Sequence, residues 1–406
     1  MKKLFWTLLS LCLVAAVFII FAYLGNRDKI SAFGEDTENK NTIYIGLYEP
    51  LTGDNAQGGL SEALGVRYAN SVCPTVEING TTYNIKLVES DSSADEVDSA
   101  PAAIALSKSK VCAVIGSYGS AQTAAGSLVF SGKSLPLIGV SCASQSATKD
   151  SANYFRMCFT DSFQSGIMSN LAKSMNLEHA VVLTQTGDAY SKAAGKTFSE
   201  AFSKLGGEVT ELSFQSGQEN FRALAKEILD SEADFVYMLS GSPEAGYFIN
   251  QARGEGLLCP ILGSETWDSA LLLNNLSFTA NDVYFASEFN SGDDADPVAS
   301  EFAGNFSSWI ESDSQRIADN GGNSYCSSSS ALAYDSYMLL VAAIKNAGSG
   351  DPSAIIQSLT AITYQGITGS ISFDEKGESE KKMAYIKSFN LNKQKFEVLQ
   401  ISSAGE

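Results

Sequence analysis

The chain has very little histidine and little positive charge. Its 406 residues include one histidine, His179, and 27 lysines and arginines against 46 aspartates and glutamates, so the formal net charge is -19. A surface this acidic repels a phosphate backbone, and no basic patch with interleaved aromatics offsets it. We therefore expect no nucleic-acid partner. A zinc enzyme or a histidine-based acid–base catalyst also normally needs more imidazole than one residue supplies.

Motifs of hydrolases and nucleotide-binding enzymes are incomplete. Residues 139–143 resemble a hydrolase nucleophile turn, but the last glycine is missing and His179 precedes a predicted strand, at the wrong end for a base. The segment Gly-Lys-Thr at 195–197 lacks the earlier glycine of a phosphate-binding loop, because Tyr190 stands at that position. The sequence predicts no enzyme activity and no cofactor, with a serine-type hydrolase as a distant alternative.

None of the seven cysteines has the spacing of a metal ligand. The sequence contains no C-x-x-C pair and no histidine-rich tract, so we expect no metal. Beyond residue 24 six cysteines remain, an even number compatible with disulfides in an oxidising compartment. The preferred pairs are Cys142 with Cys158, which one short crossover separates, and Cys73 with Cys112, where a helix should return near a strand. Other connectivities stay open.

One long apolar run lies at the N-terminus. Residues 4–24 are apolar apart from two polar positions and follow a short basic start. A helix of about 20 apolar residues spans a bilayer, whereas a cleaved signal core has about 7–15, so the length favours an anchor over a cleaved signal peptide. Lipidation at Cys12 is a third alternative. Residues 25–41 are polar and predict a flexible tether that joins the membrane to an extracytoplasmic body.

From residue 42 onward, strand and helix patterns alternate. The first set has strands at 43–48, 83–89, 111–115 and 135–139 and helices at 59–71, 95–108 and 120–131. The second set has strands at 180–184, 208–214, 235–239, 261–262 and 283–285, with helices at 164–175, 191–205, 221–230 and 244–253. Then come residues 297–309, an acidic and Gly/Ser-rich stretch, helices at 330–345 and 352–359, and three apparent strands ending near 399.

This pattern predicts an α/β fold with two doubly wound, Rossmann-like lobes. Because helices and strands continue beyond the second set, we expect the chain to cross a hinge between the lobes several times. We assign 42–159 plus 288–366 to the first lobe and 160–287 plus 367–406 to the second.

Candidate ligand contacts follow the predicted strands, because doubly wound sheets bind ligands at the carboxyl ends of their strands. In the loop at 116–123, which contains Tyr118, the hydroxyl and free N–H groups at Ser120 open a helix and suit a carboxylate; an ordinary helix cap is the alternative. The loop at 139–145 is small and rich in hydroxyls, and it contributes Ser141, Ala143 and Ser144. The two loops should face one crevice.

Two further candidates follow strands of the second lobe. Glu265 could hold an ammonium group, with Trp267 packing nearby, although a solvated loop acid is an equal alternative. Tyr190 could lie over a ligand, or it could pack locally at the start of a helix.

A series of short motifs follows in the order of a known family. These motifs are IG (45–46), PLTG (50–53), GSYGS (116–120), YFR (154–156), FVY (235–237), QAR (251–253), AYD (333–335) and GITG (366–369). From residue 41 to the C-terminus the chain resembles the type I periplasmic solute-binding proteins, most of all the branched-chain (Leu/Ile/Val-binding-like) amino-acid-binding group of ABC importers. The stretch 141–161 is similar to versions in which the cysteines matching Cys142 and Cys158 pair.

The resemblance implies a clamp that closes on an amino acid and delivers it to an ABC permease. In that family the residue matching Ser120 binds the ligand carboxylate, the carbonyl matching Ser141 takes the ammonium, the glutamate matching Glu265 pairs with it, and the tyrosine matching Tyr190 lines the wall. The same fold also serves in sensors, so a ligand-sensing ectodomain that signals through a partner is the alternative function.

Departures from the family pattern predict an altered side-chain specificity. Ala143 replaces a threonine that commonly contacts both ends of the amino acid, unless Ser144 substitutes for it. The wall aromatics of branched-chain binders are also missing, because Gly58, Gly241 and Ser329 stand at their positions. We therefore expect a side chain larger or more polar than that of leucine, isoleucine or valine.

Overall fold

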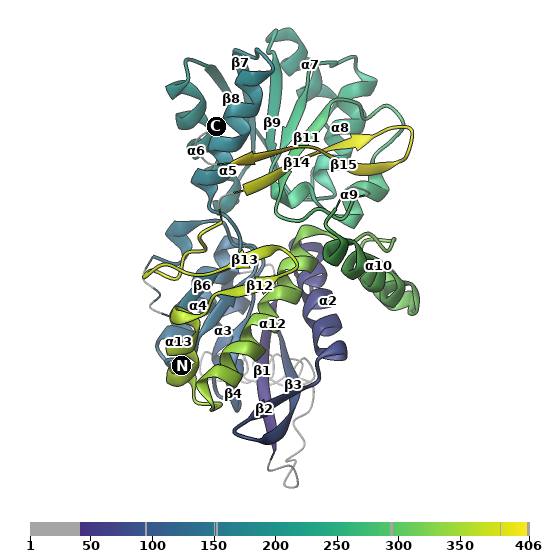
Figure 1. Ribbon diagram of the computed structural model, residues 1–406. Coiled ribbons are helices and arrows are strands. Elements are labelled where there is room, and N and C mark those ends of the chain that lie inside the picture. Colours follow the sequence, from purple (N-terminus) through teal and green to yellow (C-terminus); the bar gives the residue numbers. More distant parts are fainter. Residues whose placement is uncertain are drawn as a thin grey trace, which may run out of the picture.

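The structure, a computed structural model, describes residues 41–93, 96–149, 151, 153–292, 295–381 and 383–403. The expected signal peptide or anchor at 1–24 and nearly all of the expected tether lie outside these residues. In the described part of the chain, no helix is both long enough and apolar enough to cross a membrane. Figure 1 shows two lobes stacked end to end, each built on its own sheet.

The first lobe contains a six-stranded, mostly parallel sheet. Its order is β2 (Thr75–Ile78), β3 (Thr81–Asp91), β1 (Thr42–Glu49), β4 (Val111–Ile115), β5 (Leu137–Gly139) and β6 (Tyr154–Arg156). Only the edge hairpin β2–β3 is antiparallel. Strand β4 reads VCAVI and is buried along its whole length, as expected for a parallel strand covered by helices on both faces.

The second lobe contains a seven-stranded sheet. Its order is β15 (Lys395–Ser403), β14 (Met383–Asn390), β11 (Val283–Ser287), β10 (Ile261–Gly263), β9 (Phe235–Leu239), β7 (His179–Gln185) and β8 (Glu208–Phe214). The strands from β11 to β8 are parallel, and β14 pairs antiparallel with β11 and β15. A short hairpin, β12 (Tyr364–Gly366) and β13 (Gly369–Ile371), stands apart from both sheets.

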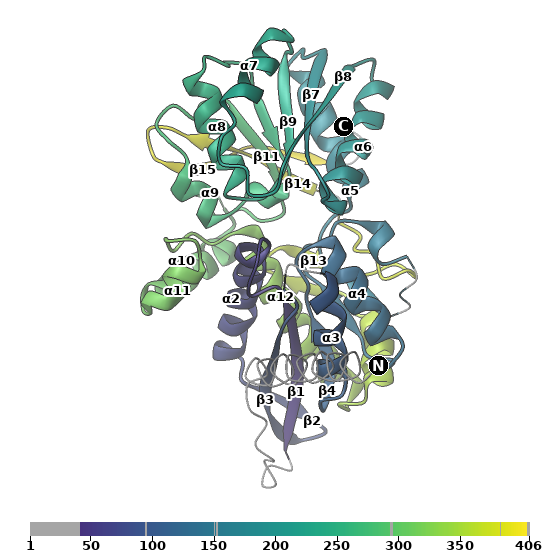
Figure 2. The ribbon, with the colours of Figure 1, turned by 180° about the vertical axis from the view of Figure 1, so that it is seen from behind.

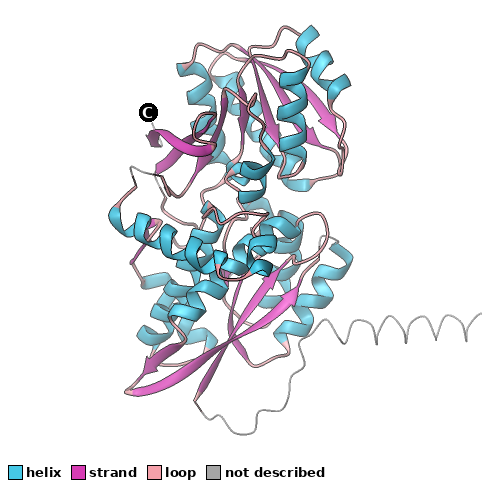
Figure 3. Ribbon diagram, turned by 90° about the vertical axis from the view of Figure 1, so that its right-hand side faces the viewer, coloured by secondary structure: helices cyan, strands magenta, loops and turns pink. Residues whose placement is uncertain are grey.

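Helices cover both faces of each sheet, as Figures 2 and 3 show. In the first lobe α2 (Ala56–Val72), α12 (Ser328–Ala347) and α13 (Pro352–Ala361) share one hydrophobic cluster, and α3 (Glu96–Ser107) and α4 (Ser120–Ser131) share another. In the second lobe α5 (Asp161–Ser174) and α6 (Ala189–Lys204) pack on one face, and α7 (Arg222–Asp230), α8 (Glu244–Gly254) and α9 (Ala270–Asn275) on the other. Helices α10 (Pro297–Glu311) and α11 (Ser314–Asp319) pack against α2. The predicted pair of doubly wound lobes is confirmed.

The described chain passes between the lobes three times: after β6, after β11, and between β13 and β14. Ile371 and Phe373 pack in the cluster that contains residues of β1. The backbone N–H of Arg156 donates to the carbonyl of Gly377, 2.8 Å away. Packing with the first lobe therefore extends past residue 366, while the expected lobe boundaries stay a prediction.

Several short elements differ from the sequence prediction. The strands β2 and β6 and the helices α9 and α11 were not expected. The C-terminal part contains four strands, β12 to β15, where three were expected, because the hairpin β12–β13 is followed by two long strands of the second sheet. Short elements carry few periodic positions, so their patterns are weak.

The described cysteines are free thiols. Cys112, Cys142, Cys158 and Cys326 are buried, and Cys73 and Cys259 are partly exposed. Neither of the expected pairs, Cys142 with Cys158 or Cys73 with Cys112, is bonded in this structure. The burial of Cys112 and Cys326 follows from their positions in apolar clusters, where a thiol packs as a small hydrophobic group.

Candidate functional site

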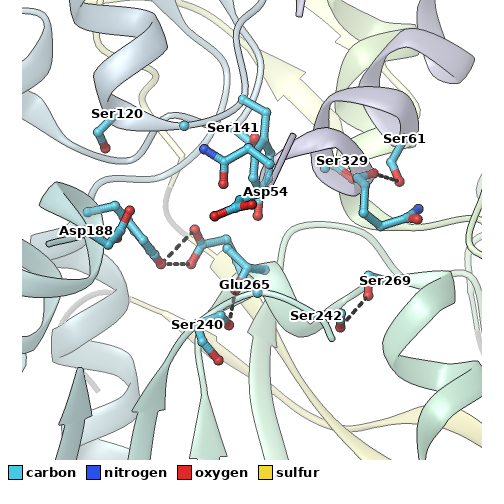
Figure 4. Close-up of a pocket in the computed structure, with 18 of the residues that line it drawn as sticks. Asp54, Ser61, Ser120, Ser141, Asp188, Ser240, Ser242, Glu265, Ser269 and Ser329 are labelled. Carbon is cyan, nitrogen blue, oxygen red and sulfur yellow. Dashed lines mark hydrogen bonds between the residues drawn. The ribbon is translucent and has the colours of Figure 1, made fainter. Parts of the chain in front are cut away.

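A polar cleft lies between the lobes, where strand ends of the two sheets face each other. Loops that follow β1, β4 and β5 line it from the first lobe, and loops that follow β7, β8, β9 and β10 line it from the second. Its non-protein space is about 1010 Å³, counting the part that is open to solvent. Figure 4 shows side chains from both lobes directed around this space. Of the expected ligand residues, Tyr118, Ser120, Ser141, Ala143, Tyr190 and Glu265 line it.

Ser120 is the first residue of α4, and its hydroxyl does not cap the helix. Gly119 takes the N-cap position and, being a glycine, supplies no side-chain cap to the N-terminal N–H groups. Gly119 has φ 89°, a conformation that a residue with a Cβ adopts only with strain. Because the first N–H groups of a helix lack partners within it, this end of α4 presents donors and a hydroxyl to the cleft. The arrangement suits an anionic group.

Ser141 is fixed in place by a buried carboxyl pair. Its hydroxyl donates to Glu62, and the backbone N–H of Tyr118 donates to Glu49 over 2.8 Å. Both glutamates have no exposed surface. Burial, followed by repulsion from Glu62, raises the pKa of Glu49 well above its ordinary value, and burial raises the pKa of Glu62 to about 7. Burial therefore favours the protonated form of both carboxyl groups, and the pair joins the loops after β4 and β5.

The carbonyl of Ser141 has no hydrogen-bond partner in the described part of the chain. The carbonyls beside it are engaged: the Arg156 guanidinium donates to those of Cys142 and Ser144. Arg156 is itself fully buried and pairs with Glu378, with 2.7 Å between Nε and Oε2. Arg156 thus shapes the loop after β5 and leaves one carbonyl free to accept a donor from a ligand.

Ala143 and Ser144 have different roles. Ala143 lines the cleft, and its carbonyl accepts a hydrogen bond from the N–H of Asp161. Ser144 does not line the cleft: its hydroxyl lies 2.9 Å from the hydroxyl of Ser146, and its carbonyl faces Arg156. The structure therefore gives no support to Ser144 as a substitute for the missing threonine.

Glu265 faces the first lobe from the second. It follows β10 and begins a short 3₁₀ helix (Glu265–Trp267), and the hydroxyl of Tyr190 donates to its two oxygens over 3.1 and 3.2 Å. Burial, followed by repulsion from Asp161, raises the pKa of Glu265 to about 8. Trp267 is fully buried, and its indole N–H donates to the carbonyl of Ser240 over 2.9 Å, so it connects the loop after β10 to the loop after β9. A cation next to Glu265 would restore its ionised form.

Tyr118 occupies part of the space that the missing wall aromatics leave open. A Cβ on Gly58 would collide with the Tyr118 ring, and a Cβ on Gly241 would lie 3.6 Å from its hydroxyl. Burial and repulsion from carboxylates, Glu265 first, raise the pKa of Tyr118 above its usual range. The ring therefore stands between the lobes among acidic groups, a placement that its loop position alone does not indicate.

Further carboxylates line the cleft. The hydroxyl of Ser216, after β8, donates to Asp54 of the first lobe over 2.8 Å, so the lobes touch at the mouth. Asp188 accepts a hydrogen bond from the N–H of Ser191 as the N-cap of α6, and Glu244 accepts one from the N–H of Gly217 over 3.0 Å. These residues were not among the expected contacts, although the same rule of strand ends could have selected Asp188.

Asp268 differs from the other carboxylates because a buried cation neutralises it. Lys387 of β14 lies 2.8 Å from Asp268 Oδ2, and the hydroxyls of Tyr325 and Ser287 donate to the same carboxylate. Both charged side chains are buried. Within the described residues, no group of three or more histidines, cysteines, aspartates or glutamates has an arrangement that could hold a metal ion. The expected absence of a metal remains a prediction.

Comparisons with known proteins agree on one family. Residues 42–390 match the family described as "Periplasmic binding protein". An "Amino acid binding protein" of Pseudomonas aeruginosa is 25% identical over 354 residues, which are 86% of this chain and 90% of that protein. A branched-chain amino acid transporter substrate-binding protein of Streptococcus pneumoniae, solved with isoleucine, is 28% identical with a TM-score of 0.77 and covers 89% of this chain and 99% of its own.

The same fold holds other ligands. A solute-binding protein of an ABC transporter from R. palustris, solved with benzoate, has a TM-score of 0.78 to this chain at 18% identity and covers 89% of this chain and 96% of its own. At that identity the likeness concerns the fold alone. The ligand must therefore be argued from the side chains of the cleft.

Proposed function

Because the chain belongs to the periplasmic binding protein family, whose members are non-enzymatic transport receptors, we propose that it captures an α-amino acid between its lobes. Family membership makes it an extracytoplasmic solute-binding protein. We further propose that it delivers the amino acid to an ABC permease and that residues 4–24 attach it to the membrane or direct its export.

One observation carries the proposal: the cleft contains complementary groups for the two ends of an amino acid. Ser120 and the N-terminus of α4 present donors for a carboxylate from the first lobe. Glu265 presents an acceptor for an ammonium group from the second lobe, and the free carbonyl of Ser141 is a second acceptor. A zwitterion would satisfy both sides at once.

Ligand binding and lobe closure are then coupled. Ser120 and Ser141 sit on the first lobe and Glu265 sits on the second. Only a closed cleft therefore offers the ligand all three partners, so the ligand shifts the population toward closure. The contact between Ser216 and Asp54 at the mouth is one place where the closed form would be held. Small-angle scattering should show a more compact particle when the amino acid is present.

Calorimetric titration tests the proposal directly. The full chain, kept in detergent because of its apolar segment and unfolded and refolded to remove carried ligand, is titrated with each of the twenty amino acids. We expect one amino acid to bind with a dissociation constant of micromolar order or below. Glu265→Ala should weaken binding by on the order of 2–5 kcal/mol, and Ser120→Ala, which removes one hydrogen bond to a charged group, by about 1.5–3 kcal/mol.

The exposed residue Glu227 on α7 provides a matched control, because Glu227→Gln changes the same kind of group far from the cleft. This variant should bind like the unaltered chain. Heat changes indistinguishable from dilution for all twenty amino acids would refute the proposal.

A further inference from the structure

The cleft contains more carboxylates than one ammonium group of a ligand can neutralise. Five carboxylates line it, namely Asp54, Asp188, Glu244, Glu265 and Asp268, and no lysine or arginine does so among the described residues. Asp268 is neutralised by Lys387. On the proposed function, Glu265 takes the α-ammonium group of the ligand. Asp54, Asp188 and Glu244 then remain without a cationic partner, and they form no salt bridge within the described chain.

These three carboxylates meet around one space rather than scattering over the surface. Asp54 comes from the turn after β1, Asp188 from the N-cap of α6, and Glu244 from the start of α8. Both Asp188 and Glu244 act electrostatically on the hydroxyl of Tyr118, together with Glu265. Figure 4 shows Asp54, Asp188 and Glu265 around the same opening. Their existing hydrogen bonds come from neutral donors and leave their charges uncompensated.

The second-lobe wall of the cleft also contains a buried hydroxyl group that a polar ligand could satisfy. The hydroxyl of Ser240, directly after β9, is buried and has no hydrogen-bond partner among the described residues, although the residue lines the cleft. Its carbonyl is already used by Thr266 and Trp267. A buried hydroxyl without a partner has lost its hydrogen bonds to water, a free-energy cost that a polar ligand group would recover. Apolar side chains would leave that cost in place.

We propose that the ligand is an α-amino acid whose side chain carries a second positive charge, as in arginine, lysine or ornithine. The inference rests on the proposed function and adds the side chain. The α-carboxylate and α-ammonium groups bind at Ser120 and Glu265, and the side-chain cation lies among Asp54, Asp188 and Glu244 beside Tyr118. A cation next to an aromatic ring gains further attraction from the face of the ring.

The space at Gly58 and Gly241 fits this assignment. In this chain the Tyr118 ring lies against Gly58 and approaches Gly241. The cleft therefore contains a tyrosine among carboxylates, in part of the space where the resemblance implies wall aromatics. An aliphatic side chain would have to displace water from several charged groups without replacing their hydrogen bonds, and this penalises leucine, isoleucine and valine.

The test titrates the full, ligand-stripped chain with L-arginine, L-lysine, L-glutamine, L-leucine, L-glutamate and agmatine, which is arginine without its carboxylate. We expect arginine or lysine to bind at least 100-fold more tightly than leucine, glutamine and glutamate. Agmatine should bind at least 100-fold more weakly than arginine, because the donors at Ser120 would have no anion to meet.

Asp188→Asn and Glu244→Gln remove charge but keep an oxygen for the hydrogen bonds from Ser191 and Gly217. Each should weaken arginine or lysine at least tenfold, and the Glu227→Gln control should leave the affinity unchanged. Raising the salt concentration should weaken binding as well, since the charges near the mouth are screened.

The outcomes separate the two proposals. If leucine or glutamine binds as tightly as arginine and lysine, or if both amide variants bind arginine and lysine normally, the cationic assignment is overturned while the amino-acid function stands. Agmatine binding as tightly as arginine would overturn the assignment to an amino acid. No binding by any of the five amino acids at millimolar concentration would overturn the cationic assignment, and silence in the screen of all twenty would overturn the proposed function with it.

Discussion

The affinity for the amino acid should rise steeply with pH because Glu265 must ionise to pair with an ammonium group. The pKa of Glu265 is raised to about 8 by burial and by Asp161. A ligand cation favours the carboxylate, so it lowers this pKa, and binding below pH 8 releases a proton. The sign follows: protons compete with the ligand, and the dissociation constant falls as pH rises toward 8.

The size of the effect follows from the ionised fraction of the free protein. With a pKa of about 8, that fraction rises from roughly 1% at pH 6 to about 50% at pH 8. If the complex holds Glu265 fully ionised, the dissociation constant falls about 50-fold over this interval, or about 2 kcal/mol. At pH 7 the complex should release about 0.9 proton per ligand bound.

Calorimetry in two buffers of different ionisation enthalpy measures both quantities. The amino acid that binds most tightly in the screen is titrated at pH 6, 7 and 8, and the proton release is the slope of the observed enthalpy against the buffer enthalpy. Glu265→Gln keeps an acceptor for Tyr190 but cannot ionise, so its affinity should be weak and nearly independent of pH. Glu227→Gln should retain the full pH dependence. A flat profile in the unaltered chain, or a steep one in Glu265→Gln, would refute the reasoning.

Three further predictions concern the surroundings of the cleft. The raised pKa of Glu62, about 7, means that the fold favours its protonated form, so the free energy of unfolding should decrease as pH rises from about 4.5 to about 7. In urea unfolding at pH 5 and 8, Glu62→Gln should reduce this decrease by on the order of 2 kcal/mol. An equal decrease in Glu62→Gln and in the unaltered chain would contradict the assignment. Lys387→Met should lower the free energy of unfolding by about 3–5 kcal/mol, because it leaves Asp268 buried and unpaired. Lys393→Met, at an exposed ion pair, should lower it by less than about 1 kcal/mol. Similar losses in the two variants would show that burial of the ion pair is unimportant. Gly58→Ala should weaken ligand binding at least tenfold, because the added Cβ forces the Tyr118 ring aside. Gly304→Ala on α10, where a Cβ meets no atom, should leave binding intact. An unchanged calorimetric affinity in Gly58→Ala would mean that the ring position is not important for binding.

The fold was predictable because its central strands are continuous apolar runs. Strands β4 and β9, which are buried along their whole length, begin and end where the sequence pattern places them. Strand β2 was missed because four residues with alternating exposure carry too little pattern to distinguish a strand from a loop. The loops after β4, β5 and β10 were found because parallel sheets bring strand ends together, a rule that needs no side-chain detail.

The remaining site residues depend on contacts that no local pattern contains. Asp54 and Ser216 meet across the lobes although 162 positions separate them. Glu62 lies in a helix where an acidic residue is normally exposed, yet it is fully buried beside Glu49. The position of the Tyr118 ring depends on Gly58, because a Cβ at that position would collide with the ring. Such contacts can be recognised only once the packing of the two lobes is known.

The repeated crossing of the chain has a consequence for biogenesis. Helix α12 packs on the first sheet and strand β14 completes the second, although both come from the last quarter of the chain. Neither lobe therefore has a complete core until the ribosome has made the last quarter of the chain. Partly made chains therefore leave apolar sheet faces uncovered, and such faces favour aggregation until the C-terminal segment has emerged.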